Sequence, residues 1–165
     1  MPSKAKAKGN AFERDVAKHL TQVFGGNFTR VPTSGAMTGG MNASVLERLS
    51  DSQKLLLEGD LIPPDNMTRM KIECKSHKAF SFPKLFSKNA ALDSWIEQAR
   101  CRDKTWFLIF KITNQGTYLC FTRNVFKTCR ELQGRNYLIY DKYYYVTSMD
   151  GFFEEYWDLL LRICE

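Results

Sequence analysis

The sequence lacks the features that would place the protein in a membrane or in an oxidising compartment. No apolar run approaches the ~20 residues needed to cross a bilayer. Met1 to Lys8 leads into a polar segment rather than an apolar one, so we expect no signal peptide. The five cysteines are odd in number and show none of the paired spacings typical of zinc sites. We therefore expect reduced thiols and a cytoplasmic protein.

Internal repeats and domain linkers are also missing, so the 165 residues predict one domain with a sizeable core. The hydrophobic content of 44% is ordinary for a globular protein. The net charge of +6 suits a polyanionic partner, most often nucleic acid. Composition alone is equally compatible with a basic surface that has no partner.

Two short apolar runs between Gly59 and Lys78 carry charged residues in a regular pattern. Asp60 opens the first run, and Glu73 and Lys75 lie two positions apart in the second. Side chains alternate along a strand, so Glu73 and Lys75 share one face. The Pro-Pro-Asp-Asn sequence at 63–66 predicts a turn, and a hairpin there would bring Asp60 near Glu73. Two carboxylates and an ammonium are costly to bury, but they suit a hard cation beside a phosphate.

The N-terminal segment predicts a flexible arm followed by a helix. Residues 1–9 form the arm, whose three lysines could touch phosphates: Lys4, Lys6 and Lys8. Residues 10–24 have the apolar spacing of an amphipathic helix with Asn10 as its N-cap. Glu13 borders the apolar side of this helix. A first-turn acid favoured by the helix dipole is an equally good interpretation of Glu13.

Four segments together resemble the PD-(D/E)XK nucleases, and within them the archaeal-type Holliday junction resolvases and their phage relatives. They read Gly-Asn-Ala-Phe-Glu-Arg in the first helix, Arg-Val-Pro-Thr-Ser-Gly at 30–35, Gly-Asp-Leu-Ile at 59–62 and Ile-Glu-Cys-Lys-Ser at 72–76. The resemblance covers residues 9–78, roughly half of the chain. It implies a restriction-endonuclease-like fold in which a mixed central sheet is flanked by helices. If the protein is phage-encoded, it would act in the host cytoplasm.

The resemblance also implies roles for individual residues. Asp60 and Glu73 would bind Mg²⁺ or Mn²⁺, helped by the Cys74 carbonyl and by Glu13 through water. The implied catalytic set is Glu13, Ser34, Asp60, Glu73 and Lys75. With the basic arm and the lysine after the second run, the expected DNA-binding set is Lys4, Lys6, Lys8, Arg14, Arg30, Ser34, Lys78 and Gln98. Gln98 is included because many members of the superfamily place a helix glutamine near the site.

The segment between the second and third of these motifs departs from a compact connection. Residues 35–58 predict a mobile loop that could lie over DNA, although a plain surface insertion explains them equally well. Asp51 within this loop competes with Asp60 as the metal-binding acid. We favour Asp60, because it starts an apolar run and the turn leads directly to Glu73.

The second half of the chain predicts the rest of a mixed α/β domain spanning residues 10–165. We expect a helix over 90–100, strands over 106–112, 118–121, 137–140 and 143–146, a short helix over 124–133 and a last helix capped by Ser148 or Asp150. Phe80, Phe82 and Phe86 lie among lysines, where they could stack on bases or pack in the core.

Three functions are compatible with these residues. The first is a Mg²⁺-dependent endonuclease that resolves four-way DNA junctions as a homodimer. Its interface would come from Phe153, Trp157 and Leu160 and from the strand over 106–112. The second is a restriction-like or repair endonuclease acting on duplex DNA. The third is a noncatalytic nucleic-acid-binding protein of the same fold.

Overall fold

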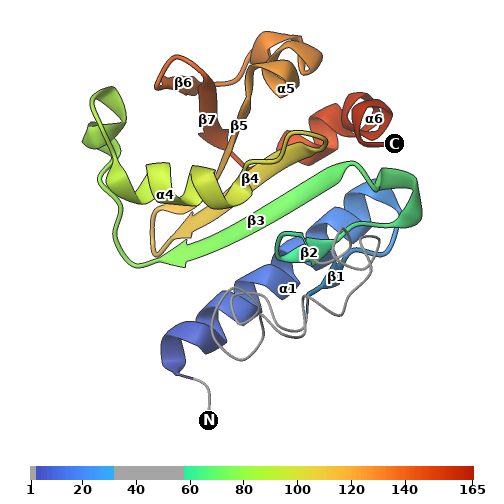
Figure 1. The fold of residues 1–165 in the computed structure, drawn as a ribbon, viewed down its shortest axis with the longest axis horizontal. Coiled ribbons are helices and arrows are strands. Elements are labelled where there is room, and N and C mark those ends of the chain that lie inside the picture. The colour runs from blue at the N-terminus through green and yellow to red at the C-terminus, as the bar shows by residue number, and fades with distance from the viewer. Residues whose placement is uncertain (1–2, 32–57) are drawn as a thin grey trace.

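The computed structural model describes residues 3–31 and 58–165, and these form one open mixed sheet flanked by helices (Figure 1). The strand order is β1-β2-β3-β4-β5-β7-β6. The strands are β1 (Thr29–Arg30), β2 (Leu61–Ile62), β3 (Met70–His77), β4 (Thr105–Ile112), β5 (Gly116–Thr122), β6 (Tyr137–Tyr140) and β7 (Tyr144–Ser148). The helices are α1 (Lys4–Phe24), α4 (Ala90–Ala99), α5 (Arg123–Thr128) and α6 (Phe152–Cys164), with 3₁₀ turns η2 (Asp65–Met67), η3 (Phe82–Phe86) and η4 (Arg130–Leu132). The expected single α/β domain is confirmed.

Strands β3 and β4 form the centre of the sheet and run parallel, with Glu73 paired to Leu108 and Lys75 to Phe110. A parallel pair needs a crossover, which α4 supplies. The other neighbouring strands of the described sheet pair antiparallel. Strand β4 is apolar on both faces because helices cover both sides of it.

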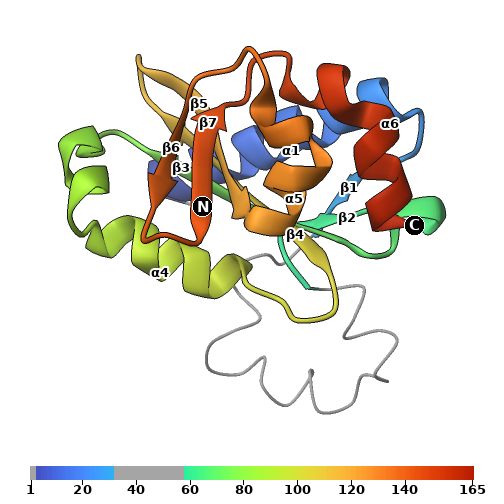
Figure 2. The ribbon, with the colours of Figure 1, turned by 90° about the horizontal axis from the view of Figure 1, so that it is seen from above.

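Helix α4 lies on one side of the sheet and α1, α5 and α6 lie on the other (Figure 2), and each side has its own hydrophobic core. Even-numbered positions of β4 from Trp106 to Ile112 pack with Leu92, Trp95 and Ile96 of α4. Phe107 and Ile109 pack on the opposite side with the apolar stripes of α1, α5 and α6. Since paired residues on neighbouring strands point the same way, Glu73 and Lys75 lie on the α4 side of β3.

The first helix begins six residues earlier than we expected. Its N-cap is Ser3, whose hydroxyl accepts a 3.3 Å hydrogen bond from the Lys6 amide, so Asn10 is not a cap. Alanine and lysine are strong helix formers, which allows the helix to run through Gly9. Lys4, Lys6 and Lys8 are therefore exposed on the first turns of α1.

Most of the residues expected at the dimer interface are buried within the chain itself. Phe153 and Leu160 are fully buried against the sheet, and Trp106–Ile112 belong to the central strand β4, where all of them except Lys111 are buried. Of the proposed interface residues on α6, Trp157 is exposed.

Helix α6 begins at Phe152 after Gly151, rather than at a Ser148 or Asp150 cap. None of the helices in the described part of the chain has the length and apolar character that a membrane crossing requires.

Candidate active site

Asp60 is held beside β3 by its own main chain. Gly59 before it has φ +86°, and a Cβ there would come within 2.5 Å of the Ile72 carbonyl oxygen. A glycine is therefore required for the close approach. The Asp60 amide donates to Ile72 O at 2.8 Å, and Leu61 pairs with Ile72 across the β2–β3 hairpin. The hairpin expected from the turn sequence is confirmed.

The Asp60 carboxylate reaches across this hairpin to the Glu-X-Lys segment. Its Oδ2 accepts a 2.7 Å hydrogen bond from the Cys74 amide, between Glu73 and Lys75. Asp60 and Glu73 are each 8% exposed. Two acids that lie 13 positions apart in the sequence are thus buried close enough for their charges to interact.

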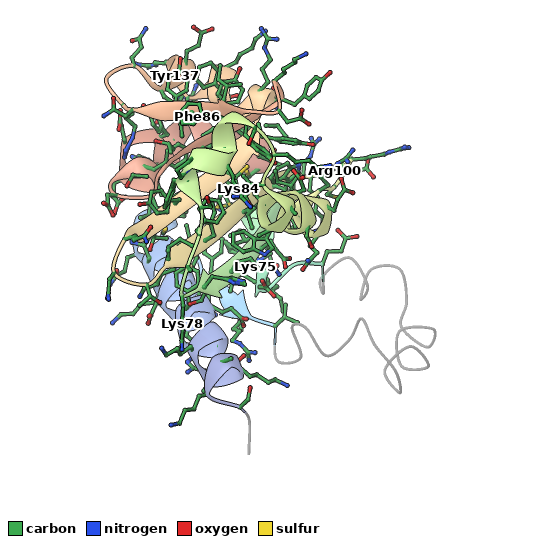
Figure 3. The ribbon with its side chains drawn as sticks, turned by 90° about the vertical axis from the view of Figure 1, so that its left-hand side faces the viewer. Lys75, Lys78, Lys84, Phe86, Arg100 and Tyr137 are labelled. Carbon is green, nitrogen blue, oxygen red and sulfur yellow. The ribbon has the colours of Figure 1, made fainter. Side chains whose placement is uncertain are left out.

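Lys75 is fixed by two acceptors. Its Nζ donates to Glu73 Oε1 at 2.6 Å and to Gln98 Oε1 at 2.7 Å. Gln98 lies on α4, and its side-chain nitrogen Nε2 donates in turn to the backbone carbonyl oxygen of Ser94 at 3.2 Å. The structure therefore joins Glu73, Lys75 and Gln98, which the sequence placed in one site (Lys75 is labelled in Figure 3).

Burial and repulsion raise the pKa of Asp60 from its ordinary value of 3.8 to about 7. Loss of solvent is the largest cause, followed by the negative charge of Glu73; the Cys74 amide and Lys75 act in the opposite direction, and Glu13 adds to the rise. A cation between the two carboxylates would relieve this repulsion. The acid pair is thus a suitable place for a divalent metal ion.

The donor set fits Mg²⁺ better than an ion that needs a complete protein cage. Among residues 3–31 and 58–165, no three Asp, Glu, His or Cys side chains gather closely enough to hold a metal. Mg²⁺ usually keeps several waters and binds through one or two carboxylates, which Asp60 and Glu73 supply. The role of Glu13 through water stays a prediction.

Glu13 instead forms an ion pair with Arg30, in which Arg30 Nε donates to Glu13 Oε2. A second guanidinium nitrogen of Arg30 donates to Asn10 Oδ1 at 2.8 Å. The residue after Arg30 hydrogen bonds to Asp60, Val31 N to Asp60 O at 2.9 Å. Helix α1 and strand β1 thereby bring Glu13 and Arg30 to the edge of the acid site.

The remaining predicted residues are either on the surface or outside the described residues. Ser34, the competing acid Asp51 and almost all of the loop at 35–58 belong to residues 32–57, which the structure does not describe. The other expected DNA contacts are exposed, four on α1 and one just after β3: Lys4, Lys6, Lys8, Arg14 and Lys78.

Sequence reasoning missed Lys71. This lysine is 8% exposed and lies two positions before Glu73, on the same face of β3. Its Nζ donates to the carbonyls of Gln98 at 2.9 Å and Arg100 at 3.3 Å, at the C-terminal end of α4. A cation is favourable at a helix C-terminus. The alternation that grouped Glu73 with Lys75 would have pointed to Lys71 as well.

The chain is similar to a known protein family. Residues 4–161 match the model of a family described as "Phage putative PDDEXK endonuclease". No curated protein and no solved structure matches the chain.

Proposed function

The chain belongs to this phage PD-(D/E)XK endonuclease family, and from that membership we propose that it is a Mg²⁺-dependent DNA endonuclease whose active site is Asp60, Glu73 and Lys75. One observation carries the proposal: the Cys74 amide binds Asp60 at 2.7 Å, while the residues on either side of Cys74 form a 2.6 Å ion pair. Two acids and an ammonium close together would suit metal-assisted hydrolysis of a phosphodiester.

The two carboxylates would hold the metal, with the Cys74 carbonyl and a water-mediated contact from Glu13 as further expected ligands. When bound, Mg²⁺ would polarise the scissile phosphate and lower the pKa of a water. Mn²⁺ is expected to substitute. Asp60 and Glu73 contribute rigidity, because each is buried and hydrogen bonded on the sheet.

Lys75 would orient the attacking water or neutralise charge developing on the phosphate. Its two bonds, to Glu73 and Gln98, direct the ammonium before substrate binds, and such preorganisation is what makes a charge effective in catalysis. Arg30 and Ser34 are the proposed phosphate contacts, and Arg30 is already oriented by Glu13 and Asn10.

We further propose a four-way DNA junction as the substrate. The four-segment resemblance to junction resolvases and the net charge of +6 support this choice. Resolution needs two symmetric cuts, and each chain has one Asp60, Glu73 and Lys75 set, so two chains would act together. A homodimer is therefore part of the proposal, with an interface that does not use the buried residues of α6 or β4.

Cleavage of labelled DNA tests the proposal. A four-way junction and a linear duplex of matched sequence would be incubated with and without Mg²⁺, using wild type, Asp60→Asn, Glu73→Gln and a control variant, Asp158→Asn. The control makes the same chemical change on α6, where Asp158 pairs with Arg162. We expect paired cuts in the junction by wild type and control, and no cleavage by the two active-site variants, which keep or improve DNA binding.

Each result separates the parts of the proposal. Cleavage of the duplex alone, or a monomer mass by light scattering in the presence of junction DNA, would retain the nuclease and reject the resolvase. Full activity in Asp60→Asn or Glu73→Gln would reject the site assignment. A wild type that cuts neither DNA with Mg²⁺ or Mn²⁺ would leave a noncatalytic binding protein as the better account.

A further inference from the structure

The segment that connects β3 to α4 carries several positive charges and no negative charge. From Cys74 to Leu92 the chain contains four lysines, at positions 75, 78, 84 and 88, and no aspartate or glutamate. The last three of these lysines are exposed, whereas Lys75 belongs to the active site. A positive stretch that starts at the catalytic strand and leads outward along the surface suits a phosphate backbone.

Four large apolar side chains interrupt these lysines, and they divide into two kinds. Phe80 stacks on Trp95 with ring centroids 5.7 Å apart, Phe82 packs on Tyr118 at 4.9 Å, and Leu85 is buried. Phe86 at the end of η3 is 81% exposed, the highest value among the exposed large hydrophobic residues of the described chain. Core packing explains the first three residues and does not explain Phe86.

The three packed residues hold the main chain around the exposed Phe86 in place. Leu85 anchors the residue immediately before Phe86 in the α4 core, and the Ser87 amide after it donates to Lys84 O at 3.2 Å. The Lys84 amide donates in turn to Ser81 O at 3.2 Å. Lys75, Lys78, Lys84 and Phe86 all lie along one side of the molecule, from the end of β3 through η3 (Figure 3).

We propose that Phe86 stacks on an unpaired or unstacked base of the DNA substrate, while Lys78, Lys84 and Lys88 contact the adjoining phosphates. This inference rests on the proposed function, because it extends the same DNA beyond the catalytic site. An aromatic ring between cationic side chains matches the two components of single-stranded nucleic acid, a flat base and a charged backbone. Stacking on Phe86 would make the protein bind DNA that has unpaired or unstacked bases more tightly than a fully paired duplex.

Equilibrium binding without metal tests the inference, since EDTA prevents cleavage. Fluorescence anisotropy would compare a fully paired duplex with the same sequence containing a short single-stranded gap. The variants are Phe86→Ala, Phe86→Leu and Phe86→Trp. The matched control is Trp157→Ala, because Trp157 is 48% exposed but lies on α6 among Glu154, Glu155 and Asp158.

We expect Phe86→Ala and Phe86→Leu to lose roughly 5- to 150-fold in affinity for gapped DNA, the range of one base–aromatic stack, and much less for the duplex. Phe86→Trp should restore the affinity, and Trp157→Ala should not change it. Phe86 has no charge, so its variants should keep the wild-type salt dependence. Lys84→Ala should instead weaken both DNAs and lower the salt slope by about one.

Three outcomes would overturn the inference while leaving the nuclease intact. The first is that Phe86→Ala binds gapped DNA as tightly as wild type. The second is that Phe86→Leu binds gapped DNA as tightly as wild type. The third is that Phe86→Ala sediments as a smaller species than wild type, which would assign Phe86 to a protein–protein contact. If wild type binds neither DNA, the proposed function fails together with the inference.

Discussion

Replacing Asp60 by asparagine should stabilise the metal-free protein while destroying its activity. The folded protein raises the pKa of Asp60 from 3.8 to about 7, so ionisation of this group opposes folding. Because one pKa unit corresponds to 1.36 kcal/mol, this change sets an upper limit of roughly 4 kcal/mol on the cost of ionising Asp60 in the folded protein, with burial the largest cause and repulsion by Glu73 the next. Asparagine keeps the acceptor for the Cys74 amide and removes the charge.

The sign of the effect depends on pH. Below pH 3.8 both the folded and unfolded states hold the Asp60 proton, and the group contributes nothing to stability. Between pH 3.8 and about 7 the folded state holds the proton more tightly, so wild-type stability falls as pH rises. Above pH 7 the cost is complete and constant. The advantage of Asp60→Asn should therefore be small near pH 4 and largest above pH 7.

Thermal unfolding followed by circular dichroism measures this advantage. For a domain of this size, a gain of about 2–4 kcal/mol raises Tm by roughly 4–15 °C. Excess Mg²⁺ at pH 8 should raise the Tm of wild type and leave that of Asp60→Asn nearly unchanged, so that the difference in Tm between the two proteins becomes smaller. Asp158→Asn serves as the control and should follow wild type at every pH. An Asp60→Asn protein no more stable than wild type at pH 8, or equally stabilised at pH 4, would refute the reasoning.

Three further changes have distinct expected results. Lys75→Ala should lower cleavage by orders of magnitude yet keep Mg²⁺ affinity by calorimetry; lost metal binding with lost folding would make the lysine structural. Gly59→Ala should cost at least ~2 kcal/mol in urea unfolding, because its Cβ would meet a main-chain oxygen at 2.5 Å, whereas Gly9→Ala, with nothing within 4 Å, should gain ~0.5–1 kcal/mol. Lys71→Met should free the end of α4 and lower kcat about 10-fold or more without weakening DNA binding; unchanged kcat would contradict a positioning role.

Local rules were enough to predict the centre of the site. Strand alternation placed Glu73 and Lys75 on one face, and turn chemistry at 63–66 implied the hairpin that brings Asp60 to Cys74. Both rules act over a few residues and need no knowledge of the rest of the fold. The apolar run of β4 and the helix carrying Gln98 were predictable for the same reason.

Features that depend on distant partners were not predictable from the sequence. Asn10 has the composition of an N-cap, but its side chain binds Arg30 from β1, and Ser3 caps the helix instead. The aromatic residues of α6 looked numerous enough for an interface, but the α1 side of the sheet is broad enough to bury Phe153 and Leu160. Phe82 and Phe86 both lie among lysines in the sequence, but in the fold Phe82 packs against the rings of Phe80 and Tyr118, whereas Phe86 is exposed.

The pairing of β1 with β2 holds together two segments that are far apart in the sequence. Val31 N bonds to Asp60 O at 2.9 Å, so the chain leaves the sheet and returns to it at the same point. The positions of Arg30 and Asp60 are fixed by strand pairing and by Gly59, and not by the number of residues between them. Closing a longer connection costs only about 0.6 kcal/mol for each doubling of length. We therefore expect the main-chain position of Asp60 to be insensitive to the number of residues between Val31 and Glu58.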